Sequence, residues 1–111
     1  LFTAKVAASG YRSVIEGLLA LHAVDGSKLG ADRALNLRTR AVTVGEMIES
    51  LRRVARDRKL GAISEEPDPF VMKVISAWPE QMHATRAAAL GFPQDESIDS
   101  IIREYISDYL K

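Results

Sequence analysis

Cysteine is absent from the 111 residues, which excludes disulfides, thiolate-bound metals and thiol catalysis. An excess of charge of one sign is also missing, because 15 basic residues balance 15 acidic ones. A neutral chain has no counterion-release drive toward nucleic acid and no attraction to an anionic membrane, so we expect neither partner. No apolar run approaches the ~20 residues that cross a bilayer. From these absences we expect a cytoplasmic protein.

What is present fits one folded domain over residues 1–111. The apolar fraction is 47% and the charged fraction 27%, which is ordinary for a globular chain. The sequence opens on Leu1 and not on methionine, which fits either a trimmed start or a piece of a longer protein. We expect such a fragment.

Helices dominate the predicted secondary structure. Apolar residues recur at helical spacing in five stretches, which predict helices over residues 9–24, 43–58, 70–77, 80–90 and 97–109. Ser9 is the expected N-cap of the first helix, and Thr43 with Glu46 has the form of a capping box. Gly26 and Gly91 suit the left-handed position that ends a helix.

Short strands complete the prediction. Apolar or β-branched residues between polar turns predict brief extended stretches at 6–8, 33–37, 41–43 and 60–64. The expected fold class is therefore α+β, mainly helical, with a few short strands.

Two stretches carry a family resemblance. Ala34-Leu35-Asn36-Leu37 leads into Val42-Thr43-Val44-Gly45-Glu46-Met47-Ile48. Nearer the end, Arg86-Ala87-Ala88-Ala89-Leu90-Gly91-Phe92-Pro93 leads into a helix that opens at Ser97. Together they resemble the carboxy-terminal portion of extended short-chain dehydrogenases, the NAD-dependent epimerase/dehydratase family. Ser76-Ala77-Trp78-Pro79 is similar to a narrower branch, the D-erythronate dehydrogenases.

The resemblance implies a substrate-binding lobe without its Rossmann domain. The family's cofactor turn, Gly-x-x-Gly-x-x-Gly, and its catalytic Tyr-x-x-x-Lys do not occur in these 111 residues. It therefore implies no cofactor in this chain, NAD or NADP in the full-length enzyme, and a sugar, nucleotide-sugar or sugar acid as substrate. Its expected partner is the Rossmann domain of the parent chain. An isolated lobe is expected to be catalytically inactive and, with apolar surface uncovered, to form a homo-oligomer.

Arg12 and Trp78 are the residues that the resemblance assigns to substrate binding. Arg12 lies where related enzymes carry a Ser-Pro-Arg, and a guanidinium fork suits an anionic group. The alternative for Arg12 is a solvated arginine at a helix start. The alternative for Trp78 is a core or interface aromatic.

Other charged residues have simpler interpretations. The arginines of residues 52–58 are expected on a solvated helix face, partly paired with Glu49 and Asp57. His83 has no second ligand at helical spacing, so no metal site is expected there.

Two functions remain open from the sequence. One is the substrate lobe of an NAD(P)-dependent oxidoreductase or epimerase, and the other is a stand-alone small helical module for protein interaction.

Overall fold

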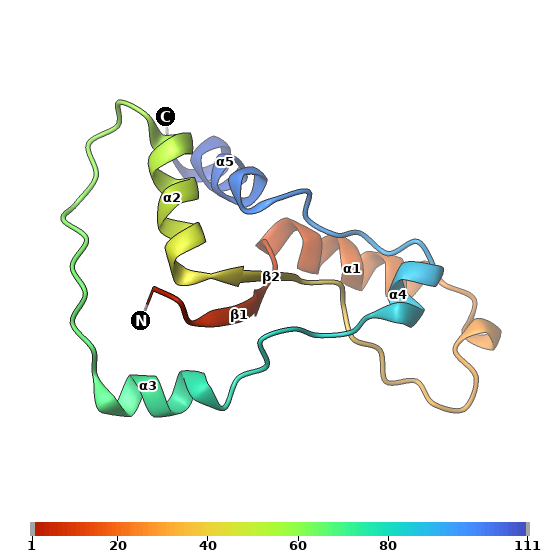
Figure 1. Cartoon of the computed structure of the whole chain (residues 1–111). Coiled ribbons are helices and arrows are strands. Elements are labelled where there is room, and N and C mark those ends of the chain that lie inside the picture. The colour runs from red at the N-terminus through yellow and green to blue at the C-terminus, as the bar shows by residue number, and fades with distance from the viewer. Residues whose placement is uncertain (1, 111) are drawn as a thin grey trace.

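The computed structural model describes residues 2–110 and confirms the mainly helical α+β class. Figure 1 shows the order of the elements. They are β1 (Lys5–Ala8), α1 (Tyr11–Ala23), a 3-10 turn η1 (Gly26–Lys28), β2 (Arg40–Thr43), α2 (Val44–Ala55), α3 (Pro69–Ser76), α4 (Thr85–Ala89) and α5 (Ile98–Tyr109). Among the described residues there is no Rossmann-type sheet.

The packed body of the molecule consists of the β1–β2 ribbon, α2 and α5. The two strands are antiparallel, with Lys5 opposite Thr43 and Ala8 opposite Arg40. Thr43 ends β2 and begins α2, because its hydroxyl accepts from the Glu46 N–H at 3.1 Å and the Glu46 carboxylate accepts from the Thr43 N–H at 3.2 Å. The predicted capping box is therefore confirmed. α5 packs along α2 (Figure 1).

Buried residues are few. The apolar ones are Leu29, Val42, Ala55, Ala87 and Phe92.

A buried carboxylate joins the start of α1 to the loop before α5. Asp95 is 4% exposed. Its side chain accepts from the Gly10 N–H at 2.7 Å and from the Ser13 hydroxyl at 2.8 Å, and its carbonyl accepts from Arg40 Nε at 2.7 Å. A Cβ at position 10 would lie 2.8 Å from the Asp95 Oδ1 atom, so glycine permits this close approach.

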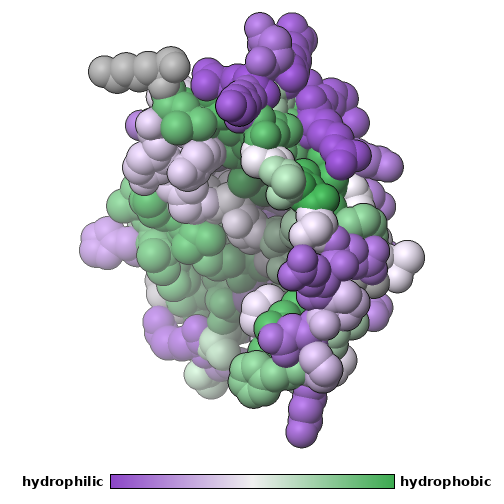
Figure 2. Space-filling model, turned by 90° about the vertical axis from the view of Figure 1, so that its left-hand side faces the viewer, coloured by the Kyte–Doolittle hydropathy of each residue, from purple (hydrophilic) through white to green (hydrophobic). Residues whose placement is uncertain are grey.

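The molecule is a thin plate with an open side. Its extents are 50 × 36 × 17 Å, and residues 56–83 form a long arc, with α3 in its middle, that is exposed at nearly every position (Figure 1). Phe70 on α3 is 73% exposed. Figure 2 views the molecule from this side and shows apolar side chains open to solvent over much of it. Within residues 2–110, no helix has the length and apolarity that a membrane crossing needs.

Several predicted elements differ in the structure. The strands predicted at 33–37 and 60–64 do not form, since neither stretch has a strand beside it. The helix predicted over 80–90 is limited to Thr85–Ala89, and the His83 carbonyl instead accepts from the Asn36 amide at 3.3 Å.

Of the predicted helix caps, some are confirmed and others differ in the structure. Gly10 and not Ser9 is the N-cap of α1, because the Ser9 hydroxyl donates to the Arg38 carbonyl at 3.2 Å. Gly26 opens a 3-10 turn, and the left-handed conformation falls on Gly30, with φ of 66°. Gly91, with φ of 75°, ends α4 as predicted.

Candidate functional site

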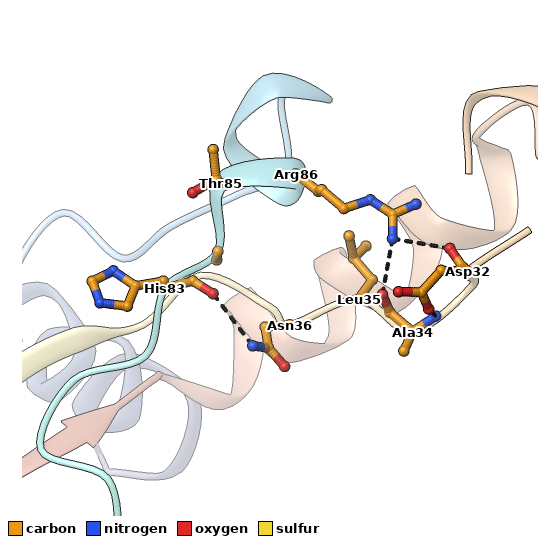
Figure 3. Close-up of a pocket in the computed structure, with 8 residues that line it drawn as sticks. Asp32, Ala34, Leu35, Asn36, His83, Thr85 and Arg86 are labelled. Carbon is orange, nitrogen blue, oxygen red and sulfur yellow. Dashed lines mark hydrogen bonds between the residues drawn. The ribbon is translucent and has the colours of Figure 1, made fainter. Parts of the chain in front are cut away.

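A polar groove lies between the extended segment before β2 and the start of α4 (Figure 3). Its volume is about 320 Å³, and it is lined by Asp32, Ala34, Leu35, Asn36, His83, Ala84, Thr85 and Arg86. Arg86 fixes one wall by donating to the carbonyls of Leu29, Asp32 and Ala34 at 2.6, 2.9 and 3.1 Å. The Asn36 amide bonded to the His83 carbonyl closes the other end.

A second hollow of about 290 Å³ adjoins this groove and shares His83, Ala84 and Thr85 with it. Arg38 lines it while donating to the Phe92 carbonyl at 3.1 Å and the Gln94 side chain at 3.0 Å. The two hollows offer an imidazole, hydroxyls and amides, groups that form hydrogen bonds with a hydroxylated small molecule. Within residues 2–110, no hydrogen bond joins His83 to Thr85.

Arg12 lies in the first turn of α1 and is already paired. Its Nε donates to Asp108 Oδ2 at 3.0 Å and its Nη2 donates to Asp108 Oδ1, so the guanidinium forms a two-point ion pair with the end of α5. The Tyr11 hydroxyl donates to the same carboxylate, and this hydrogen bond raises the pKa of Tyr11 to about 12. The bonds from Arg12 and Tyr11 hold the pKa of Asp108 below its ordinary value.

Trp78 lies just beyond α3 and is 55% exposed, so it is not a core aromatic in this chain. The next residue, Pro79, accepts from the Ala7 N–H at 3.3 Å and brings this segment beside β1. No hydrogen bond or ring contact joins Trp78 to Arg12 among the described residues, and neither of them lines the groove.

The basic residues at the end of α2 surround a third hollow of about 510 Å³, lined by Arg53, Val54, Arg56, Arg58, Arg103 and Ile106. Arg53 donates to both oxygens of Asp99, at 2.8 and 2.7 Å, and the Ser50 hydroxyl donates to the same carboxylate. Arg53 and Arg103 therefore pair with Asp99 on α5, which the sequence did not predict, and of the predicted partners Glu49 attracts Arg53 electrostatically without forming an ion pair within residues 2–110.

The sequence interpretation missed the polar groove, although Asn36 and Arg86 both lie in the stretches that carry the family resemblance. It also missed Asp108, which is 96 residues from Arg12 and has no local pattern to reveal it. No cluster of three metal-ligating side chains occurs within residues 2–110.

Comparison with known proteins identifies relatives, although no family model matches the sequence. A D-erythronate dehydrogenase from Cupriavidus necator is 41% identical over 83 residues, which are 75% of this chain and 26% of that protein. A D-erythronate dehydrogenase from Haemophilus influenzae is 32% identical over 72 residues, which are 65% of this chain and 23% of that protein.

The fold has a solved counterpart. The crystal structure of a nucleoside-diphosphate-sugar epimerase from Agrobacterium tumefaciens matches 99% of this chain with a TM-score of 0.90 and 32% identity, and the match covers 32% of that structure. The matches thus cover only 23 to 32% of the length of these relatives.

Proposed function

Because the chain is a relative of the extended short-chain dehydrogenases, as its sequence motifs indicated, we propose that it is the substrate-side, carboxy-terminal portion of a dehydrogenase that oxidises a sugar acid. The observation that carries the proposal is the 41% identity to a D-erythronate dehydrogenase over three quarters of the chain. A small four-carbon sugar acid of the erythronate class is the proposed substrate.

The cofactor and the acid–base pair of such an enzyme must come from another part of the protein. Neither Gly-x-x-Gly-x-x-Gly nor Tyr-x-x-x-Lys occurs in the 111 residues. The proposed source is a Rossmann portion that binds NAD or NADP, and the 111 residues alone are expected to be inactive.

Exposed apolar faces support the proposal that the chain packs against another portion of the protein. On α1, Ile15, Leu18 and Leu19 are 54, 58 and 64% exposed, which is unusual for three large apolar side chains on one helix face. In isolation these faces are expected to cause self-association.

Arg12 is the proposed partner of the substrate carboxylate. Its pair with Asp108 uses Nε and Nη2, which leaves Nη1 outside that pair. Trp78, exposed beside β1, is the proposed apolar wall of the substrate mouth.

A stand-alone interaction module is the second candidate, since the same exposed faces would suit it. The coding sequence upstream of Leu1 separates the two. A glycine-rich cofactor turn and a Tyr-x-x-x-Lys in frame are expected for the dehydrogenase, and a start codon immediately before Leu1 would exclude it.

Activity of the longer protein tests the role of Arg12. Reduction of NAD or NADP is measured with four-carbon sugar acids, and Arg12→Gln is expected to raise KM about tenfold or more, as the loss of a charge-assisted hydrogen bond predicts. Asp108→Asn is the matched control, because it breaks the same ion pair while keeping the guanidinium. Equal effects of the two variants would make Arg12 a purely structural residue.

A further inference from the structure

Four arginines line the third hollow, which lies where the end of α2 meets α5 (Figure 1). They are Arg53, Arg56 and Arg58, from the end of α2 and the turn that follows it, and Arg103 from α5. Val54 and Ile106 complete the lining of this space of about 510 Å³, so none of its lining residues is acidic. Four like charges around one hollow repel each other, and a bound anion would relieve that repulsion.

One carboxylate serves two of these cations. Asp99 accepts from Arg53 through both of its oxygens, whereas Nη2 of Arg103 lies 3.8 Å from the same carboxylate and pairs with it only loosely. Within residues 2–110, the side chains of Arg56 and Arg58 form no hydrogen bond or ion pair. Two guanidinium groups at the hollow are therefore available to a ligand, and a third is held weakly.

Arg56 has a backbone conformation that favours glycine. Its φ is 50° and its ψ is −110°, and among the described residues no other residue except glycine has a positive φ. The Arg56 N–H donates to the Arg52 carbonyl at 3.2 Å and so ends α2, but this bond needs no side chain. Strained backbone of this kind is concentrated at ligand-binding and switch regions of proteins. The guanidinium is the part of Arg56 that glycine could not supply.

We propose that this hollow binds a small anion with several charges on phosphate groups, such as pyrophosphate. A guanidinium offers paired hydrogen bonds to phosphate oxygens, and Glu49 and Asp57, the nearest acidic residues along the chain, do not line the hollow. A chain with no net charge favours a small anion over nucleic acid, whose binding depends on neutralising many phosphates. The site is separate from the proposed function, because neither Arg12 nor Trp78 lines it.

Calorimetric titration of the 111-residue chain with inorganic pyrophosphate tests this proposal. Saturable binding at one site is expected, with weaker binding of inorganic phosphate and a loss of affinity as salt is added. Arg56→Gln with Arg58→Gln is expected to weaken the binding about tenfold or more, because charge-assisted hydrogen bonds are lost. Arg52→Gln with Lys59→Gln is the matched control, since it removes the same charge beside the hollow from residues that do not line it, and it should weaken binding by about threefold at most.

Substitutions at Arg56 alone give a second measurement. Arg56→Gly is expected to raise the melting temperature, because glycine adopts a φ of 50° without strain, and to weaken pyrophosphate binding. Arg56→Ala is the matched control, because it loses the guanidinium but keeps the strain, so it should weaken binding without raising the melting temperature. An Arg56→Gly chain that binds pyrophosphate as tightly as the unchanged protein would contradict the role of this side chain.

The remaining outcomes are distinct. No saturable binding at millimolar pyrophosphate would overturn the proposal, and so would equal weakening by the two double variants, since only the overall charge would then matter. Tighter binding of an oligonucleotide than of pyrophosphate would also make the proposal wrong. A longer protein that binds pyrophosphate but oxidises no sugar acid would contradict the proposed function and leave the anion site in place.

Discussion

The body formed by β1, β2, α2 and α5 and the arc of residues 56–83 are built differently. In the body, polar groups find partners within the chain, as Asp99 on α5 does with Arg53 on α2, and helix starts are capped by neighbouring side chains. Along the arc, nearly every side chain faces solvent, and the apolar residues of α3 contact little. The difference leads us to expect that the body contributes most of the unfolding free energy of the 111-residue chain and the arc very little.

The largest effect is expected at the buried aromatic ring that follows α4. Phe92 is 3% exposed, so Phe92→Ala removes a buried ring and leaves a cavity that costs about 3–5 kcal/mol of unfolding free energy. Denaturant unfolding of the 111-residue chain measures it. A loss below about 1 kcal/mol would mean that the surroundings of Phe92 are loosely packed and would remove the contrast with the arc.

The second largest effect is expected at Asp95, because its carboxylate accepts hydrogen bonds from two donors. Asp95→Ala leaves the Gly10 N–H without its acceptor and is expected to cost about 1–3 kcal/mol. Asp57→Ala, in an exposed turn, is the control and should change unfolding by less than about 0.5 kcal/mol. Similar values for both variants would contradict the role of Asp95 in joining α1 to the loop before α5.

Acid should weaken the contact between α2 and α5. Hydrogen bonds from Arg53 and then Ser50 hold the pKa of Asp99 well below its ordinary value. The Asp99 carboxylate therefore binds a proton more weakly in the folded state than in the unfolded state, where the pKa of an aspartate is about 3.9. The stabilisation is complete above that pH and is lost as the pH falls toward the folded value.

The measurement is the difference in stability between the protein and Asp99→Asn as the pH is lowered. The difference is expected to be largest near neutral pH and to shrink below about pH 4. A difference that stays constant down to strongly acidic pH would show that the carboxylate charge contributes nothing to the contact.

The smallest effect is expected in the arc. Phe70 is 73% exposed, so Phe70→Ser should change the unfolding free energy of the 111-residue chain by no more than about 0.5 kcal/mol. Circular dichroism with denaturant measures this. A loss comparable to that of Phe92→Ala would erase the distinction between the two regions.

Local signals in the sequence predicted the parts of the fold that depend on neighbouring residues. The Thr43–Glu46 box, Gly91 after α4 and the start of α5 at Ser97 were all predicted correctly, because caps act within a few residues. The predicted strands at 33–37 and 60–64 did not form, because a strand also needs a partner, and no other described segment supplies one.

The candidate site was less predictable for the same reason. The Arg12–Asp108 pair joins the two ends of the chain, and the groove brings Asn36 and His83 together across 47 residues. Contacts between residues so far apart in the sequence leave no periodic pattern in it. Arg12 and Trp78 themselves remain predictions, and the kinetic variants above test the role of Arg12.

The ion pair between α1 and α5 has a consequence for any anionic ligand. Asp108 already accepts from two nitrogens of Arg12, Nε and Nη2. A ligand carboxylate must therefore either bind Arg12 through Nη1 or displace Asp108 and the end of α5. Displacement would free Tyr11 of its hydrogen bond to the same residue. The apparent affinity of every such anion would then be its affinity for the opened form multiplied by the fraction of molecules that are open.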